Sequence, residues 1–260
     1  MHNEILTIGP FTIYGYGLMT AIGIISAYVT ATLRAKKRGL DPDRIFGLVV
    51  ACAVFGYVAS KLLYCVTILP RILEDPANFL TLATGWVVYG GIIGGIFGGW
   101  LYCRIRKLDF IRYFDLAMPS VALAQGFGRI GCFLAGCCYG QETDLPISIT
   151  FTNSEFAPNG VELIPTQLYS SAFDFALAFF LMYLASRTEK KGVIAASYLI
   201  IYSVGRFIIE FFRGDLIRGA VGALSTSQFI AVFMAAAGAM ILYVALKKSP
   251  VTDEGTADKE

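Results

Sequence analysis

The stretch IFGLVVACAVFGYVASKLLYCVTIL, residues 45–69, decides the fold, because Lys61 is its single charged residue. An apolar run of about twenty residues is long enough to cross the hydrocarbon core of a bilayer as an α-helix. The run therefore predicts a transmembrane helix.

The whole chain shares this apolar character. It is 56% hydrophobic and 15% charged, with a mean hydropathy of +0.65, whereas a soluble domain is usually about 25% charged. Segments of similar length and character recur along it, at roughly 11–33, 45–69, 86–103, 114–134, 167–186, 193–212 and 224–246. The sequence thus predicts an all-α integral membrane protein with seven transmembrane helices.

The charges of the connecting segments predict an orientation. Most of the 21 Lys and Arg residues lie in one set of connections, namely 34–44, 104–112, 187–192 and the C-terminal tail. The opposite set carries only Arg71, Arg213 and Arg218. By the positive-inside rule the N-terminus is expected outside and the C-terminus in the cytoplasm.

The domain organisation is expected to be simple. Residues 1–248 would form one seven-helix domain, with an outer loop at about 138–166. The polar residues 249–260 would form a disordered cytoplasmic tail. No cleaved signal peptide is expected, since the first ten residues contain no Lys or Arg for a positive n-region.

Several ionisable residues fall inside the predicted spans. The basic ones are Lys61, Arg129 and Arg206, and the acidic ones are Asp174 and Glu210. Each basic side chain costs about 2.5–3.5 kcal/mol at a helix centre, so such residues are functional candidates by default. For Lys61, snorkelling toward a helix end is an equal alternative, and for Arg129 it is a weaker one.

The sixth span carries a row of polar residues. Tyr202, Arg206, Glu210 and Arg213 recur at helical spacing on one face. An internal ion pair between Arg206 and Glu210 is one interpretation. Arg129, however, has no acid nearby in its own helix, so two guanidinium groups need anions in a low-dielectric site, and a phosphate suits both.

Glycines in the third span form two rows at a spacing of four. The rows are 90–94–98 and 91–95–99, and such rows permit close packing between helices. The alternative is that they leave room for an acyl chain, with Tyr89 at its mouth. Tyr16 lies similarly between two glycines in the first span; both tyrosines also fit the role of interfacial anchors.

Three cysteines follow Arg129 closely. Cys132, Cys137 and Cys138 are interpreted first as apolar filling, and second as a disulfide that Gly136 would allow. A metal site is weaker, because C-x4-C-C is not a zinc pattern and His2 is the only histidine. A nucleophilic thiol is the remaining alternative. No metal is therefore assigned.

Other functional classes find no support in the sequence. It contains no P-loop, no dinucleotide fingerprint and no Ser-His-Asp arrangement. The basic loops are short and typical of topology determinants, so nucleic-acid binding is not expected.

Taken in order, the motifs resemble one family. They are IGPFTIYGYGLM (8–19), YGGIIGG (89–95), GRIGCFLAGCCYG (128–140), PTQLYS (165–170), GRFIIEFFRGD (205–215) and STSQFIA (225–231). The chain resembles the bacterial prolipoprotein diacylglyceryl transferases over nearly its whole length. Seven spans with the N-terminus outside are also what this family shows.

The resemblance implies an activity and a site. Such enzymes transfer the diacylglyceryl group of phosphatidylglycerol to the lipobox cysteine of preprolipoproteins in the bacterial cytoplasmic (inner) membrane, releasing glycerol phosphate, without a cofactor. Arg129 and Arg206 would hold the lipid phosphate, with Tyr16 and Tyr202 beside it. Glu210 would orient Arg206.

This chain departs from the family motifs at three positions. Tyr89 stands where the family has histidine, and Cys132 and Cys137 replace an asparagine and a glutamate. Because a tyrosine with a pKa near 10 is a poor base, Tyr89 is expected to donate a hydrogen bond instead. A transferase with another acceptor, and a lipid-binding or translocating protein without chemistry, are the alternatives; a divergent second copy of the enzyme would also fit.

Overall fold

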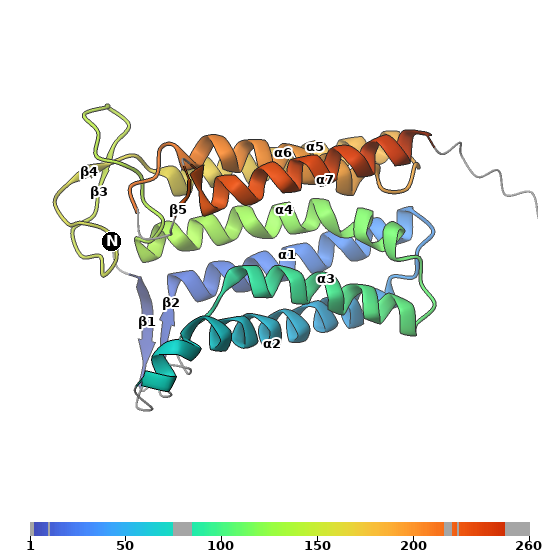
Figure 1. Cartoon of the computed structure of the whole chain (residues 1–260), viewed down its shortest axis with the longest axis horizontal. Helices are drawn as coiled ribbons and strands as arrows, with labels where there is room; N and C mark the ends of the chain where they lie inside the picture. Colours follow the sequence, from blue (N-terminus) through green and yellow to red (C-terminus); the bar gives the residue numbers. More distant parts are fainter. Residues whose placement is uncertain (1–2, 10, 75–84, 216–219, 223, 248–260) are drawn as a thin grey trace, which may run out of the picture. The chain divides into compact units, whose positions relative to one another are not determined.

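The computed structural model describes residues 3–9, 11–74, 85–215, 220–222 and 224–247 (Figure 1). These residues form seven long helices: α1 (Gly15–Lys37), α2 (Asp43–Glu74), α3 (Val88–Ile105), α4 (Phe110–Ala135), α5 (Thr166–Arg187), α6 (Val193–Glu210) and α7 (Thr226–Lys247). The predicted tail, 249–260, lies outside the described residues.

Short antiparallel strand pairs accompany the helices. They are β1 (Glu4–Ile8) with β2 (Phe11–Tyr14), β3 (Ile149–Thr150) with β4 (Glu162–Leu163), and β5 (Ala220–Val221) with β6 (Leu224–Ser225). The first and last predicted spans therefore start too early, because residues 11–14 and 224–225 are strands. β2 reads FTIY, a run of β-branched and aromatic residues that favours a strand over a helix.

The chain divides into two compact units. One comprises the described residues up to Ala27 and from Phe114 onward, and the other comprises Tyr28–Tyr113. The first unit contains the start of α1 and nearly all of α4 to α7. The second contains α2, α3 and the end of α1.

In the second unit, one glycine row joins α3 to α2. A Cβ atom at Gly94 would collide with the side chain of Ala59 and the carbonyl of Phe55, and Gly90 and Gly98 are similarly tight. At Gly91 a Cβ would meet only ordinary contacts, at 3.7 Å or more. The 90–94–98 row therefore packs helix on helix, as the first interpretation of the sequence expected.

The core of the first unit lies where α4, α5 and α6 meet. Its buried residues are Met118, Ala122, Leu177, Ala178, Leu181, Ala185, Ile194, Ala195 and Tyr198. Gly238 of α7 packs against Leu199 and Ile200 of α6. Gly23 and Gly131 let α1 and α4 approach closely, the latter against Tyr16.

A buried carboxylate fixes the start of α6. Asp115 of α4 accepts hydrogen bonds from the backbone N–H groups of Gly192 (2.6 Å) and Ala195 (2.8 Å). Free N–H groups at a helix N-terminus need such an acceptor, and a negative charge there also suits the helix dipole. Asp115 thus acts as an N-cap supplied by another helix.

The segment between α4 and α5 is folded. β3 and β4 cover a small core of Phe151, Ala157 and Leu163. Its two ends pair with each other, since Gly140 N–H donates to Ile164 carbonyl at 3.0 Å and Ile164 N–H to Gln141 carbonyl at 2.9 Å. The predicted outer loop is therefore an ordered cover at one end of its unit.

The helix surfaces are suited to lipid. Ile25, Val66, Phe179 and Phe233 are exposed by 61%, 65%, 65% and 61%, a pattern that costs heavily in water. Among the described helices, five are long and apolar enough to cross a membrane, namely α1, α2 over Asp43–Pro70, α5, α6 and α7. The protein is thus a multi-pass membrane protein.

Candidate functional site

An ion pair lies at the C-terminal end of α6. Arg206 Nη2 is 2.6 Å from Glu210 Oε2, and the two side chains are only 14% and 8% exposed. Helical geometry places residues four apart on one face, so the pair follows directly from the sequence spacing. The pair was one of the interpretations left open for this row.

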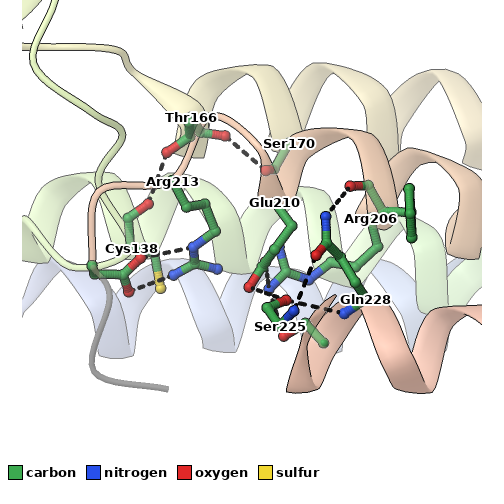
Figure 2. Close-up of polar contacts among 11 residues, drawn as sticks. Cys138, Thr166, Ser170, Arg206, Glu210, Arg213, Ser225 and Gln228 are labelled. Carbon is green, nitrogen blue, oxygen red and sulfur yellow. Dashed lines mark hydrogen bonds and ion pairs between the residues drawn. The ribbon is translucent and has the colours of Figure 1, made fainter. Parts of the chain in front are cut away.

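Ser225 of β6 and the first turn of α7 complete this polar group. Ser225 Oγ donates to Glu210 Oε1 at 3.0 Å, and Arg206 Nη2 donates to Ser227 Oγ at 3.1 Å. Gln228 binds back to α6 by donating to the Phe207 carbonyl. Figure 2 shows Glu210, Ser225, Gln228 and Arg206 facing one another. The Arg206 side chain is therefore held in one orientation from two helices.

Arg129 is in a different situation. It lies on α4, partly buried, and its guanidinium forms no hydrogen bond or ion pair within the part of the chain that the structure describes. Electrostatic interactions link it to Tyr202 and Asp174. A guanidinium offers five N–H donors, and none of them is paired with the described residues.

Asp174 of α5 lies within electrostatic reach of both Arg129 and Arg206. It is 2% exposed, and its Oδ2 atom is buried without a hydrogen-bond partner. A buried carboxylate oxygen is costly to leave unsatisfied. Asp174 thus balances part of the positive charge of the two arginines while keeping an acceptor uncommitted.

An aromatic pair forms part of the same surroundings. Tyr198 and Tyr202 of α6 stack with ring centroids 5.4 Å apart. The Tyr198 hydroxyl donates to Gln125 Oε1 at 2.9 Å, and Gln125 lies one helical turn before Arg129. Tyr202 interacts electrostatically with Arg129, so the stacked pair belongs to the surroundings of that guanidinium.

Tyr16 lies at the start of α1 in the same unit. Its backbone and ring pack against Gly131 of α4, where a Cβ atom would stand 3.3 Å away. Its side chain is 48% exposed and interacts electrostatically with Cys132, Cys137 and Cys138. Glycine at 131 is thus required for this approach.

The thiols gather at the C-terminal end of α4. The Sγ atoms of Cys132, Cys137 and Cys138 lie within 4.8 Å of one another. The pKa of the Cys137 thiol is raised, because hydrogen bonds with the Cys132 and Cys138 thiols hold its proton and burial disfavours the thiolate. A thiol that keeps its proton is a weak nucleophile.

Arg213 joins the α6–α7 connection to this cluster. It binds Asp215 through two contacts, Nε to Oδ1 at 2.8 Å and Nη2 to Oδ2 at 2.6 Å. It also hydrogen-bonds the Cys138 side chain, and Figure 2 shows the two side by side. Burial acts to lower the pKa of Arg213, but its bonds to Asp215 outweigh this and the pKa is raised.

The remaining predicted residues belong to the second unit. Tyr89 is half-buried in the first turn of α3. Lys61 of α2 donates to the Gly85 carbonyl at 3.0 Å and lies 3.9 Å from the ring centre of Trp86. Lys61 is thus engaged by its own unit.

Comparison with known sequences assigns the family. The family model described as prolipoprotein diacylglyceryl transferase matches residues 3–244. The chain belongs to the prolipoprotein diacylglyceryl transferase family. This confirms the resemblance drawn from the motifs.

Named relatives cover nearly the whole chain. The phosphatidylglycerol–prolipoprotein diacylglyceryl transferase of Clostridium tetani is 50% identical over 232 residues, 89% of this chain and 93% of the relative. The enzyme of that name numbered 2 in Clostridium perfringens is 45% identical, covering 88% and 90%. The one numbered 1 in the same organism is 34% identical, covering 83% and 84%.

Three members of this group were not singled out from the sequence: Ser225, Ser227 and Gln228. Their signal was the STSQ stretch at the start of the last span, whose polar side chains face the Arg206–Glu210 pair. Asp174 was visible as an intramembrane acid, but its spacing within α5 gave no partner. In this transferase fold its partners come from α4 and α6.

Proposed function

We propose that this chain transfers the diacylglyceryl group of phosphatidylglycerol to the lipobox cysteine of preprolipoproteins and releases glycerol phosphate. The support is family membership over residues 3–244 and the names of relatives that cover about nine-tenths of the chain. The substrates would be phosphatidylglycerol and a preprolipoprotein signal peptide.

The uncommitted guanidinium of Arg129 is the observation that carries the proposal. A cation inside an apolar protein needs an anion, and the charged acids of this unit leave Arg129 without an ion pair among the described residues. A lipid phosphate would fill that place. Arg206, fixed by Glu210 and Ser227, would hold the same phosphate from α6.

Charge development explains why two arginines accelerate the reaction. The acceptor sulfur attacks the glyceryl carbon, the carbon–oxygen bond breaks, and its electron pair stays on the phosphate oxygen. The phosphate thereby changes from a singly charged diester to a doubly charged monoester. Preorganised donors in a dry site stabilise such growing charge far better than water does.

The tyrosines would serve binding in this proposal. Tyr202, stacked on Tyr198, and Tyr16, packed on Gly131, would border the head group. Tyr89 would donate a hydrogen bond to the lipid. Its part follows from its place in the family motif, where histidine is usual.

We also propose seven spans with the N-terminus outside the cytoplasmic membrane. Within the second unit the basic connections 34–44 and 104–112 lie at one end, because the Tyr113 hydroxyl donates to the Asp41 carbonyl. Within the first unit, the basic connection 187–192 joins the ends of α5 and α6 that lie away from the ordered loop (Figure 1). The positive-inside rule places these basic ends in the cytoplasm.

The test is a reconstituted transfer assay. Purified protein in vesicles of head-group-labelled phosphatidylglycerol receives a lipobox peptide, and released glycerol phosphate and lipidated peptide are measured. Arg129→Ala should lower turnover by about 10²-fold or more. Arg112→Ala is the matched control, because Arg112 lies on the same helix with a 54% exposed side chain.

The alternatives give different results in the same assay. Head-group release without peptide lipidation would indicate another acceptor. Lipid binding without turnover would indicate a binding or translocating protein. Either result would overturn the proposal.

A further inference from the structure

The three thiols at the end of α4 form a second chemical centre in the first unit. Cys132, Cys137 and Cys138 are partly buried, and their Sγ atoms lie within 4.8 Å of one another. Among the described residues this group contains no fourth histidine, cysteine or carboxylate. The cluster is therefore a set of three equivalent soft ligands.

The backbone holds the thiols in this arrangement. Cys138 has φ = +62°, and Gly136 before it has φ = +75°. A residue with a Cβ rarely adopts a positive φ, and such conformations concentrate at functional sites. The left-handed residue turns the chain back, so that two consecutive cysteines both reach Cys132.

Helix α5 fixes the same turn from outside. The Cys137 carbonyl accepts a hydrogen bond from Gln167 Nε2, and the Cys138 carbonyl accepts one from Thr166 Oγ1, both at 2.9 Å. Cys137 N–H donates to the Cys132 carbonyl at 3.1 Å. Gln167 and Thr166 are 1% and 2% exposed, so these supports are themselves rigid.

The spacing and the charge suit a zinc ion. Zn–S bonds of about 2.3 Å in a tetrahedral site place sulfurs about 3.8 Å apart, and the three Sγ atoms already lie within 4.8 Å of one another. Three thiolates around Zn²⁺ carry one net negative charge. Arg213, hydrogen-bonded to Cys138, and Arg129, within electrostatic reach of Cys132 and Cys138, offset it.

We propose that Cys132, Cys137 and Cys138 bind Zn²⁺ and leave its fourth position open to the acceptor thiol of the preprolipoprotein. Zinc sites with three protein ligands and one open position are the catalytic kind, whereas structural sites have four. Soft sulfur ligands favour Zn²⁺ or Cu⁺ over hard cations. The proposal that this thiol is the acceptor rests on the proposed function; the binding of zinc does not.

A zinc ion at this site would cause the acceptor thiol to lose its proton, a task that Tyr89 is not expected to perform. The acceptor thiol gives its proton to solvent when its sulfur takes the open position, since a thiol bound to zinc is deprotonated. The sulfur then forms its bond to the glyceryl carbon while the carbon–oxygen bond to phosphate breaks. The product thioether is a weaker ligand and leaves; glycerol phosphate carries the electron pair away.

The experiment measures zinc first and transfer second. Full-length protein is purified in detergent with a phosphine reductant, and zinc is quantified by atomic emission. About one zinc per chain is expected, with loss of zinc in Cys132→Ser, Cys137→Ser and Cys138→Ser. The control is Cys65→Ser, which changes a half-buried cysteine of α2. A protein with this substitution should still bind about one zinc per chain.

Cobalt substitution then tests the open position. The Co²⁺ form should show the visible absorption of a tetrahedral thiolate site, and a lipobox peptide should change that spectrum, whereas the same peptide with Cys→Ser should not. A strong chelator should lower transfer by about 10²-fold or more, and added Zn²⁺ should restore it.

The outcomes separate the two proposals. Active enzyme without zinc, with a disulfide or three free thiols by thiol titration, overturns the zinc site and leaves the proposed function standing. Bound zinc with transfer unchanged after its removal overturns the acceptor role. Bound zinc in a protein that lipidates no peptide supports the site and overturns the proposed function.

Discussion

Glu210 holds Arg206 of α6 and Ser225 of β6 with the two oxygens of one carboxylate. Its Oε2 atom lies 2.6 Å from Arg206 Nη2, and its Oε1 atom accepts a hydrogen bond from Ser225 Oγ at 3.0 Å. Arg206 therefore has a charge partner and a fixed direction at once. A residue that only stabilised α6 would need no contact with Ser225 of β6.

Glu210→Gln should therefore affect stability and turnover together. The amide keeps the size and can accept from Ser225, but it leaves the Arg206 charge uncompensated. Removing one partner of a buried pair costs about 3–5 kcal/mol, and we expect the low end because both groups keep some exposure. Turnover should fall by about 10²-fold, measured by glycerol phosphate release.

Ser227→Ala is the control for this change. It removes one neutral acceptor from Arg206 and should cost about 1 kcal/mol, with a small change in turnover. If Glu210→Gln and Ser227→Ala lowered turnover equally, the charge of Glu210 would have no specific role in turnover.

Arg129→Lys tests whether geometry or charge matters at the uncommitted guanidinium. Lysine keeps the charge but loses the planar pair of donors that matches a phosphate. We expect kcat/KM for phosphatidylglycerol to fall by at least about tenfold, while Arg112→Lys on the exposed part of the same helix leaves it unchanged. Full activity in Arg129→Lys would show that this position needs only a positive charge and not the planar geometry of a guanidinium.

The helices of this protein could be predicted because their signal is local. The bounds of α3 and α5 agree with the apolar runs to within about two residues. Helix α2 continues about five residues beyond the end of its run, and α4 begins about four residues before the start of its run. The ion pair of Arg206 and Glu210 was also predictable, since a spacing of four on a helix fixes the geometry.

The rest of the site depends on packing between helices. Asp174 meets Arg129 and Arg206 only because α4, α5 and α6 share one core. The cysteine spacing fits no zinc pattern, and the thiols come together through a turn that includes the left-handed conformations of Gly136 and Cys138. Neither fact is encoded in the local periodicity of the sequence.

Gly94→Ala tests the packing of the 90–94–98 row. A Cβ atom there would collide with Ala59 and Phe55, and overpacking typically costs about 1–3 kcal/mol. Gly91→Ala, on the same helix with contacts at 3.7 Å or more, should be neutral or stabilising by up to about 1 kcal/mol. Thermal unfolding in detergent measures both variants.

At Gly91 and Gly95 of the second row a Cβ atom would meet only ordinary contacts, at 3.6 Å or more, whereas at Gly99 it would lie 3.1 Å from Cys52 Sγ. The lipid interpretation is therefore tested at Gly91, with a larger side chain. Gly91→Leu should lower turnover without loss of thermal stability if an acyl chain lies along this row. Unchanged turnover would show that both glycine rows serve only the packing of helices.

Asp115 should behave as a structural acid. Asp115→Ala leaves the N–H groups of Gly192 and Ala195 without their acceptor, at a cost of about 1–2 kcal/mol. We expect a lower unfolding temperature with unchanged activity per folded molecule. Asp109→Ala, which removes an exposed cap from α4, should cost less. A loss of turnover at full stability would place Asp115 in the catalytic machinery instead.

The orientation of the chain is testable through its basic connections. Reporter domains inserted after residue 108, after residue 190 and at the C-terminus should all be active on the cytoplasmic side, and one inserted at residue 155 should be active outside. Replacing Lys36, Lys37 and Arg38 with neutral residues should weaken this orientation, because Lys and Arg near helix ends set topology. Unchanged orientation would show that later connections, 104–112 and 187–192, are sufficient. If the reporters inserted after residues 108 and 190 were active on opposite sides of the membrane, the seven-span arrangement would be contradicted.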